Sequence, residues 1–189
     1  MKMRRFVEAA LLLAIGFILR NIMPPLMLGM KPDLSLVMLF VVIMLYRDLK
    51  LTLVSGAVAG IISAFTTAFP GGQLANVVEK PLTSLSVLAI LYLVSKMKIS
   101  NKLEAGIIGL FGTLISGTLF LLITLAFVGL PGSFKALFLS VVLPTALMNV
   151  AFLYVLYPII KRIKGLTPST KQELNEASKK NSLIRLFFY

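Results

Sequence analysis

Long apolar runs separated by short polar segments fill most of the chain. A helix needs roughly 20 mostly apolar residues to cross the hydrocarbon core of a bilayer. Six runs approach or reach this length, at residues 6–23, 34–46, 51–69, 81–94, 103–128 and 134–160. The second run is short, so its helix either depends on neighbouring helices or begins earlier, near Met27. The pattern predicts an all-α fold, a polytopic membrane protein with a bundle of six transmembrane helices.

Strands are a poor alternative for these runs. Membrane strands alternate apolar and polar side chains over ~10 residues, whereas these runs are continuously apolar. A bilayer tolerates only helices and closed barrels, which leaves helices. Proline and glycine mark the ends of two runs, at Pro24 and in the segment 70–72. We expect Pro81 to begin the fourth helix, because proline is favoured in a first helical turn.

The distribution of lysine and arginine predicts the orientation in the membrane. Fifteen of the 19 basic residues fall at the N-terminus, in the second and fourth interhelical segments and after residue 160. The other four fall on the opposite side, and they are Arg20, Lys31, Lys80 and Lys135. Because basic residues concentrate on the cytoplasmic side, both termini are expected there. We therefore expect a multi-pass protein of the cell membrane.

Composition supports a membrane protein without catalytic function. Hydrophobic residues make up 58% of the chain and charged residues 14%, against about half and a quarter in soluble domains. The net charge of +12 fits the cytoplasmic bias of basic residues, so we expect no nucleic-acid partner. Cysteine and histidine are absent, which removes thiol nucleophiles, histidine triads and most zinc sites. We expect no enzyme activity, no metal and no cofactor.

Two regions follow from the pattern: a six-helix domain at residues 1–160 and a basic cytoplasmic tail at 161–189. The tail closes on apolar and aromatic residues from position 183 onward. It is expected either to lie on the membrane surface as an amphipathic helix or to bind a partner.

Small residues at helical spacing predict close helix packing. Gly56 and Gly60 form such a pair in the third run, and a stripe beginning at Gly106 follows the fifth. Pro144 removes a backbone hydrogen bond to the Ser140 carbonyl within the sixth run, so that helix should bend there. Asn149 follows, and a polar side chain within a span serves either function or interhelical bonding.

The outer side gathers charges of both signs. The candidate site residues there are Lys31, Asp33, Thr66, Thr67, Asn76, Glu79 and Lys80, with Asn149 added from the sixth helix. Lysine can meet an α-carboxylate and a carboxylate can accept from an α-ammonium, so the cluster suits a zwitterion. Phe65 and Phe69 are candidates for aromatic contact with its side group. Alternatively, these charges simply face bulk water. We expect no acidic residue in the middle of a span.

Two segments resemble the bacterial tryptophan-transporter (TrpP) family. The first is Gly-Met-Lys-Pro-Asp at residues 29–33, before an apolar helix. The second is Gly-Ile-Ile-Ser-Ala-Phe-Thr-Thr-Ala-Phe-Pro-Gly-Gly-Gln at residues 60–73, with Thr-Thr-Ala-Phe-Pro its most specific part. The similarity covers nearly all of the six-helix region and implies uptake of tryptophan.

That family is in turn similar to the substrate-binding (S) components of energy-coupling-factor transporters. Those proteins have six helices, cytoplasmic termini and an Ala-x-x-x-Ala patch on the first helix that meets a transmembrane coupling subunit. Ala10 and Ala14 match this patch. The resemblance implies the coupling subunit and ATPases as partners, although coupling to an ion gradient is the other possible energy source. The alternatives are an S component for another ligand, such as a vitamin or precursor, and a membrane scaffold that transports nothing.

Overall fold

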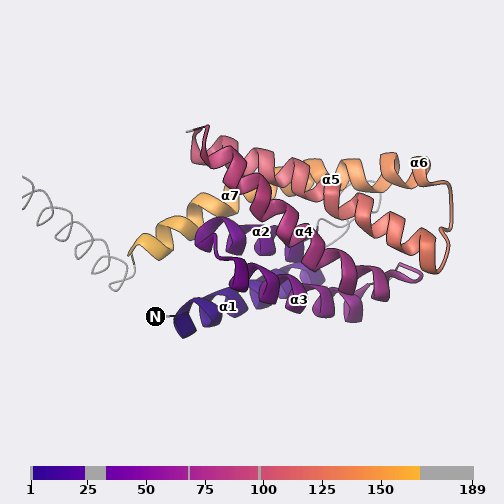
Figure 1. The fold of residues 1–189 in the computed structure, drawn as a ribbon, viewed down its shortest axis with the longest axis horizontal. Coiled ribbons are helices and arrows are strands. Elements are labelled where there is room, and N and C mark those ends of the chain that lie inside the picture. The colour runs from indigo at the N-terminus through magenta and orange to yellow at the C-terminus, as the bar shows by residue number, and fades with distance from the viewer. Residues whose placement is uncertain (1, 24–32, 68, 98, 167–189) are drawn as a thin grey trace, which may run out of the picture.

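The computed structural model describes residues 2–23, 33–67, 69–97 and 99–166, and all regular structure in these ranges is helical. The helices lie side by side as an elongated bundle (Figure 1). Their bounds are α1 Lys2–Ile22, α2 Leu34–Tyr46, α3 Leu49–Thr66, α4 Gly72–Ser95, α5 Asn101–Phe127, α6 Phe134–Leu137, the π-helical turn η1 Phe138–Val142, and α7 Leu143–Leu166. Because α6, η1 and α7 run on without a break, they act as one long helix.

The short helix α2 lies at the centre of the bundle. It packs against α1, α3, α4, α5 and α7, and its residues from Leu34 to Met44 are all buried. Its 13 residues span only about 20 Å at 1.5 Å per residue. A helix that is apolar on all sides must be buried all round. The alternative in which neighbouring helices support a short second helix is therefore the one that the structure shows.

Within the described ranges, four helices are long and apolar enough to cross a membrane. These are the segments Leu49–Thr66, Gly72–Ser95, Asn101–Phe127 and Phe134–Gly165. Many large apolar side chains on their outer faces are exposed in the isolated chain, including Ile61, Leu82 and Leu122. Such faces are stable in lipid and would be a liability in water.

The beginning of α1 and the end of α7 lie at the same end of the bundle (Figure 1). Lys164 Nζ of α7 is 3.8 Å from Glu8 Oε2 of α1 and 3.6 Å from the ring centre of Tyr46. Arg47, between α2 and α3, pairs with Glu104 at the start of α5. The same end therefore carries the α2–α3 turn and the start of α5.

The predicted start of the fourth helix is wrong. Helix α4 begins at Gly72, and Pro81 lies inside it rather than in its first turn. Gly71, at φ 71°, provides the left-handed residue before the helix. The polar residues between Gly72 and Pro81 can be helical within the bundle because they find partners there. The Asn76 amide, for instance, donates to the Gly72 carbonyl at 2.7 Å.

A related prediction also fails. Glu79 was expected near a helix end, yet it lies about two turns into α4 and is only 1% exposed. Lys80 beside it is 2% exposed, so these two charges do not face bulk water. At the other end of the chain, α7 continues to Leu166, and the rest of the predicted tail lies outside the described residues.

The glycine pair of α3 allows close contact with α4, as predicted. A Cβ atom at Gly60 would lie 2.9 Å from the Asn76 carbonyl oxygen, and one at Gly56 would lie 2.5 Å from Ser84 Oγ. On α5, a Cβ at Gly109 would lie 3.0 Å from Val150 Cα of α7. Gly106 is different, because a Cβ there meets nothing within 4 Å. The stripe on α5 therefore begins at Gly109.

A bend was predicted at Pro144, and the structure has a π turn just before this residue. Five residues, Phe138–Val142, form the turn, Leu143 separates it from the proline, and the Leu143 N–H donates to the Phe138 carbonyl. Proline cannot donate to the carbonyl four residues earlier, so the backbone there is freed to widen. Val142 and Thr145, on either side of Pro144, both reach the cavity described below.

We expect Gly60→Val to destabilise the protein by about 1 to 3 kcal/mol, because the added side chain would force α3 and α4 apart. Gly106→Val is the matched control, since it adds the same side chain at a position with open space. Thermal unfolding of both variants in detergent measures the difference. Equal unfolding temperatures for the two variants would contradict the close α3–α4 contact.

Candidate functional site

A cavity of about 270 Å³ lies at the end of the bundle opposite the beginning of α1 and the end of α7. Most of its polar lining comes from the end of α1, the segments flanking α2 and α3, and the helices α4, α5 and α7. The polar lining residues are Arg20, Asp33, Thr67, Asn76, Glu79, Lys80, Thr113, Ser116 and Thr145. The remaining lining residues are Leu36, Phe69, Gly117, Phe120, Leu121, Val141 and Val142. The cavity therefore has a charged side and an apolar side.

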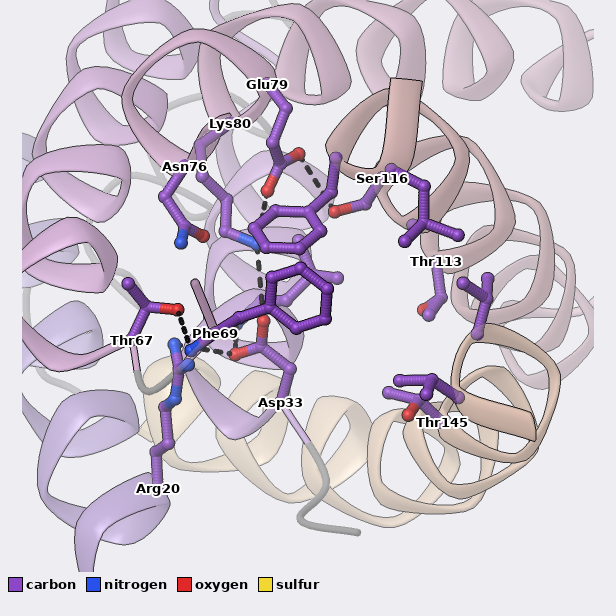
Figure 2. A pocket seen from close by; sticks show the side chains of 16 residues that line it. Arg20, Asp33, Thr67, Phe69, Asn76, Glu79, Lys80, Thr113, Ser116 and Thr145 are labelled. Carbon is purple, nitrogen blue, oxygen red and sulfur yellow. Dashed lines mark hydrogen bonds and ion pairs between the residues drawn. The ribbon is translucent and has the colours of Figure 1, made fainter. Parts of the chain in front are cut away.

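Four charged side chains form one continuous chain of ion pairs along the polar side. Lys80 Nζ is 3.2 Å from Asp33 Oδ2 and 2.7 Å from Glu79 Oε1. Arg20 approaches the other oxygen of Asp33, with Nη1 at 3.5 Å from Oδ1. Figure 2 shows Lys80 between the two carboxylates. The order of charges is thus positive, negative, positive, negative, and their sum is zero.

Hydroxyl groups hold the innermost carboxylate in place. Thr83 on the next turn of α4 donates to Glu79 Oε2 at 2.8 Å, and Ser116 on α5 donates to the same oxygen at 2.9 Å. The other oxygen, Oε1, is 2.7 Å from Lys80 Nζ and has no further partner among the described residues. A carboxylate oxygen can accept from more than one donor, so this oxygen could also accept from an ammonium group.

Asp33 has a structural role as well as its place in the cavity. Its side chain accepts from the Leu36 N–H at 3.2 Å and so caps the start of α2. Burial alone would raise the pKa of Asp33, but the neighbouring Lys80 and Arg20 outweigh burial and hold the pKa below its ordinary value. Asp33 is therefore ionised and links the central helix to the charged cavity.

The apolar side of the cavity presents two aromatic rings. Phe69, after α3, and Phe120, on α5, meet edge to face with ring centres 5.3 Å apart. The Thr67 hydroxyl accepts from the Phe69 N–H at 3.2 Å and so fixes the turn that carries this ring. Edge-to-face pairs offer both ring faces and ring edges to a further aromatic group.

The structure brings together five of the eight residues predicted for the site. Those lining the cavity are Asp33, Thr67, Asn76, Glu79 and Lys80. Thr66 lies apart, and its hydroxyl bonds back to the Ile62 carbonyl of α3 at 3.0 Å. Lys31 lies outside the described residues. Phe65 is 88% exposed and does not line the cavity, whereas Phe69 does.

Asn149 lies one turn beyond Thr145 on α7 and is fully buried. Its Nδ2 donates to Thr113 Oγ1 of α5 at 3.2 Å. Because Thr113 lines the cavity and Asn149 does not, Asn149 acts as an interhelical bond that supports the cavity wall. Figure 2 shows Thr113 and Thr145 across the cavity from the charged side.

Four polar lining residues were not predicted for the site: Arg20, Thr113, Ser116 and Thr145. In the sequence, Ser116 and Thr113 belong to the stripe of small residues on the fifth helix. Such a stripe has the same pattern whether it packs against another helix or lines a site. Arg20 lies near the end of an apolar run, and there a basic residue is ordinarily explained by the orientation of the protein in the membrane. Its position among the few basic residues of the outer side was the one sequence feature that could have identified Arg20 as a site residue.

The two alanines matched to a docking patch lie on the outer surface of α1. Ala10 and Ala14 are exposed, as are the large apolar residues beside them, including Val7, Leu11 and Ile18. No charged residue interrupts this face between positions 9 and 19. The patch is therefore accessible to lipid or to a protein partner.

Comparisons with known proteins agree over most of the chain. The model of the family described as tryptophan transporter TrpP matches residues 2–164. The chain is 43% identical over 163 residues to a "Probable tryptophan transport protein" of Bacillus subtilis, covering 86% of this chain and 94% of that relative. A protein of the same name from Clostridium acetobutylicum is 42% identical over 162 residues, with the same coverage.

A third relative of that name, from Clostridium perfringens, is 46% identical over 161 residues, covering 81% of this chain and 88% of the relative. No solved structure matches the chain. With several long apolar helices in its described part, the chain is a multi-pass protein of the cell membrane. It belongs to the tryptophan transporter TrpP family.

Proposed function

We propose that this chain takes up tryptophan and that the cavity between α1, α4, α5 and α7 is its substrate site. The observation that carries the proposal is the combination of two cations, two carboxylates and an aromatic wall around one small cavity. A volume of about 270 Å³ lies near the lower end of the range for small-molecule pockets, which suits a single amino acid.

The two kinds of lining match the two parts of tryptophan. The substrate carboxylate would pair with Lys80 and Arg20, and the α-ammonium would pair with Glu79 and Asp33. The indole ring would lie toward Phe69 and Phe120, where aromatic contacts are available. The Asn76 side-chain nitrogen already donates to the Gly72 carbonyl, so its side-chain oxygen is available to accept a hydrogen bond from the ligand or from a neighbouring loop.

Binding must exchange ion pairs, because Lys80 already contacts both carboxylates. A zwitterion brings one positive and one negative charge, so each protein charge that leaves its partner can find a new one. A ligand with only one charge would leave a protein charge buried and unpaired, which is costly. Charge balance in the cavity therefore selects for ligands with both groups.

The proposed topology has six membrane crossings with both termini in the cytoplasm. The proximity of α1 and α7 at one end of the bundle supports an even number of crossings. The cavity then lies near the outer face, where it can receive substrate from outside the cell. In this topology the buried helix α2 crosses within protein rather than against lipid.

We further propose that the chain works as the substrate-binding component of an energy-coupling-factor transporter, with α1 as its docking helix. The exposed, uncharged face around Ala10 and Ala14 supports this role, because small residues let a partner helix approach closely. A transmembrane coupling subunit and ATPases would be the partners.

Uptake of labelled tryptophan tests the proposal directly. In a strain without other tryptophan carriers, expression of the chain should restore uptake, and Glu79→Gln should reduce it at least tenfold, because buried charge partners are costly to remove. Ser86→Ala on the same helix is the control, since that hydroxyl is exposed and bonds only to the Leu82 carbonyl of its own helix. Unchanged uptake on expression of the chain would refute tryptophan transport.

Ligand charge provides a second test. Wild-type protein should bind tryptophan more tightly than tryptamine or indole-3-propionate. Lys80→Met leaves one positive and two negative groups, so it should shift preference toward tryptamine by at least tenfold. Glu79→Gln leaves two positive groups and one negative group, so it should shift preference toward the anion indole-3-propionate. Calorimetric titration measures each affinity.

Lys96→Gln is the control for the charge test, because it removes a lysine at the exposed end of α4 without touching the cavity. Its ligand preference should equal that of the wild type. If neither cavity variant changed the order of preference among the three ligands, the assignment of the charged groups would be wrong.

Larger side chains at Ala10 and Ala14 test whether a coupling subunit docks on α1. Ala10→Leu with Ala14→Leu should abolish energised uptake while leaving tryptophan binding by the purified chain unchanged, since both alanines are exposed and neither lines the cavity. Ile15→Leu, which changes the exposed residue next to Ala14 on the same helix, is the control. Normal uptake by the double variant would argue against a partner docked there.

A further inference from the structure

A second hollow lies at the opposite end of the bundle from the substrate cavity. It has a volume of about 290 Å³ and is lined by Asn101 and Lys102 of α5 and by Tyr157, Pro158, Lys161 and Arg162 of α7. Three of these six side chains are cationic, and none is acidic. This surface plays no part in the proposed transport site.

The cations converge on the hollow from two helices. Lys161 Nζ donates to Asn101 Oδ1 at 2.9 Å and lies 5.5 Å from the ring centre of Tyr157. Lys102 Nζ lies 5.5 Å from the ring centre of Tyr154, one turn before Pro158. These contacts hold the two long lysine side chains against α7, with their charged groups still in water.

Among the described residues, no carboxylate forms an ion pair with Lys102, Lys161 or Arg162. The nearest acidic group in the sequence, Glu104, is buried and pairs with Arg47. Positive charge at the hollow is therefore not neutralised within this part of the chain, and an anion can bind there without displacing a carboxylate.

The surface next to the hollow is apolar and faces outward. Tyr154 and Val155 of α7 are 45% and 55% exposed, and Leu103 of α5 is 54% exposed. Residues 154, 158, 161 and 162 share one face of α7, because they follow one another at helical spacing. An anionic headgroup at the cations would thus have its acyl chains along the exposed apolar face.

We propose that this hollow binds the headgroup of an anionic phospholipid. Basic pockets between membrane helices at the membrane surface suit phosphate headgroups, and tyrosines with one apolar and one polar end suit the same depth. A free phosphate offers the same charge but would gain nothing from the apolar face. The adjoining apolar surface is therefore what favours a lipid over a soluble anion.

Thermal unfolding of the purified full-length chain in neutral detergent tests the site, with dioleoyl-phosphatidylglycerol, dioleoyl-phosphatidylcholine or sodium phosphate added at matched ionic strength. Phosphatidylglycerol should raise the unfolding temperature more than the other two additives. Lys161→Gln with Arg162→Gln should raise the concentration for half the effect about tenfold, because each basic residue contributes to attraction by anionic lipid.

Lys50→Gln with Lys96→Gln is the matched control, since it removes two exposed basic residues that do not line the hollow. It should respond to phosphatidylglycerol like the wild type. The single change Lys102→Gln should weaken the response by a smaller factor, and it provides a reading if the double variant does not fold. An equal response to phosphatidylcholine or to inorganic phosphate, or an equal loss in the control, would overturn the proposal.

Discussion

The ion-pair chain Arg20–Asp33–Lys80–Glu79, which is buried at its Lys80–Glu79 end, is the interaction on which the arrangement of this bundle depends. A single charge in so apolar a fold would be expensive, but alternating charges within contact distance offset one another. The four residues come from α1, from the cap of α2 and from α4. Their pairing therefore fixes the relative positions of three helices and at the same time creates a polar surface inside the membrane domain.

The central helix shows how packing and the site are linked. Asp33 caps α2 and pairs with both cations, so the best-buried helix among those described begins at the charged cavity. Gly60 brings α3 into close contact with α4 at Asn76 and Lys80, two of the residues that line the cavity. A change in the charged cavity can therefore reach the packing of α2 and α4, which is the coupling a carrier requires between binding and movement.

Much of the fold could be predicted from the sequence, because the lipid-facing helices are continuous apolar runs. The bounds of α2 were predicted correctly, and α1, α3, α5 and the last helix were placed with errors only at their ends. The error at α4 has a physical cause. Asn76, Glu79 and Lys80 are polar and precede a proline, which in local terms indicates a loop. Only partners on other helices, such as Ser116 and Asp33, make that segment helical and buried.

The same distinction applies to the candidate site, in which some residues have a recognisable sequence signature and others have none. Residues with a strong chemical signature, namely Asp33, Glu79 and Lys80, could be predicted, although as groups at a surface rather than within a cavity. Thr113 and Ser116 could not, because a hydroxyl on a small-residue stripe has the same pattern whether it packs or binds.

An experimental structure of the chain with tryptophan bound would test the proposed substrate site most directly. We expect the substrate carboxylate within hydrogen-bonding distance of Lys80 or Arg20, the α-ammonium at Glu79 or Asp33, and the indole ring against Phe69 and Phe120. Tryptophan bound elsewhere, with the four-residue ion-pair chain unchanged, would contradict it.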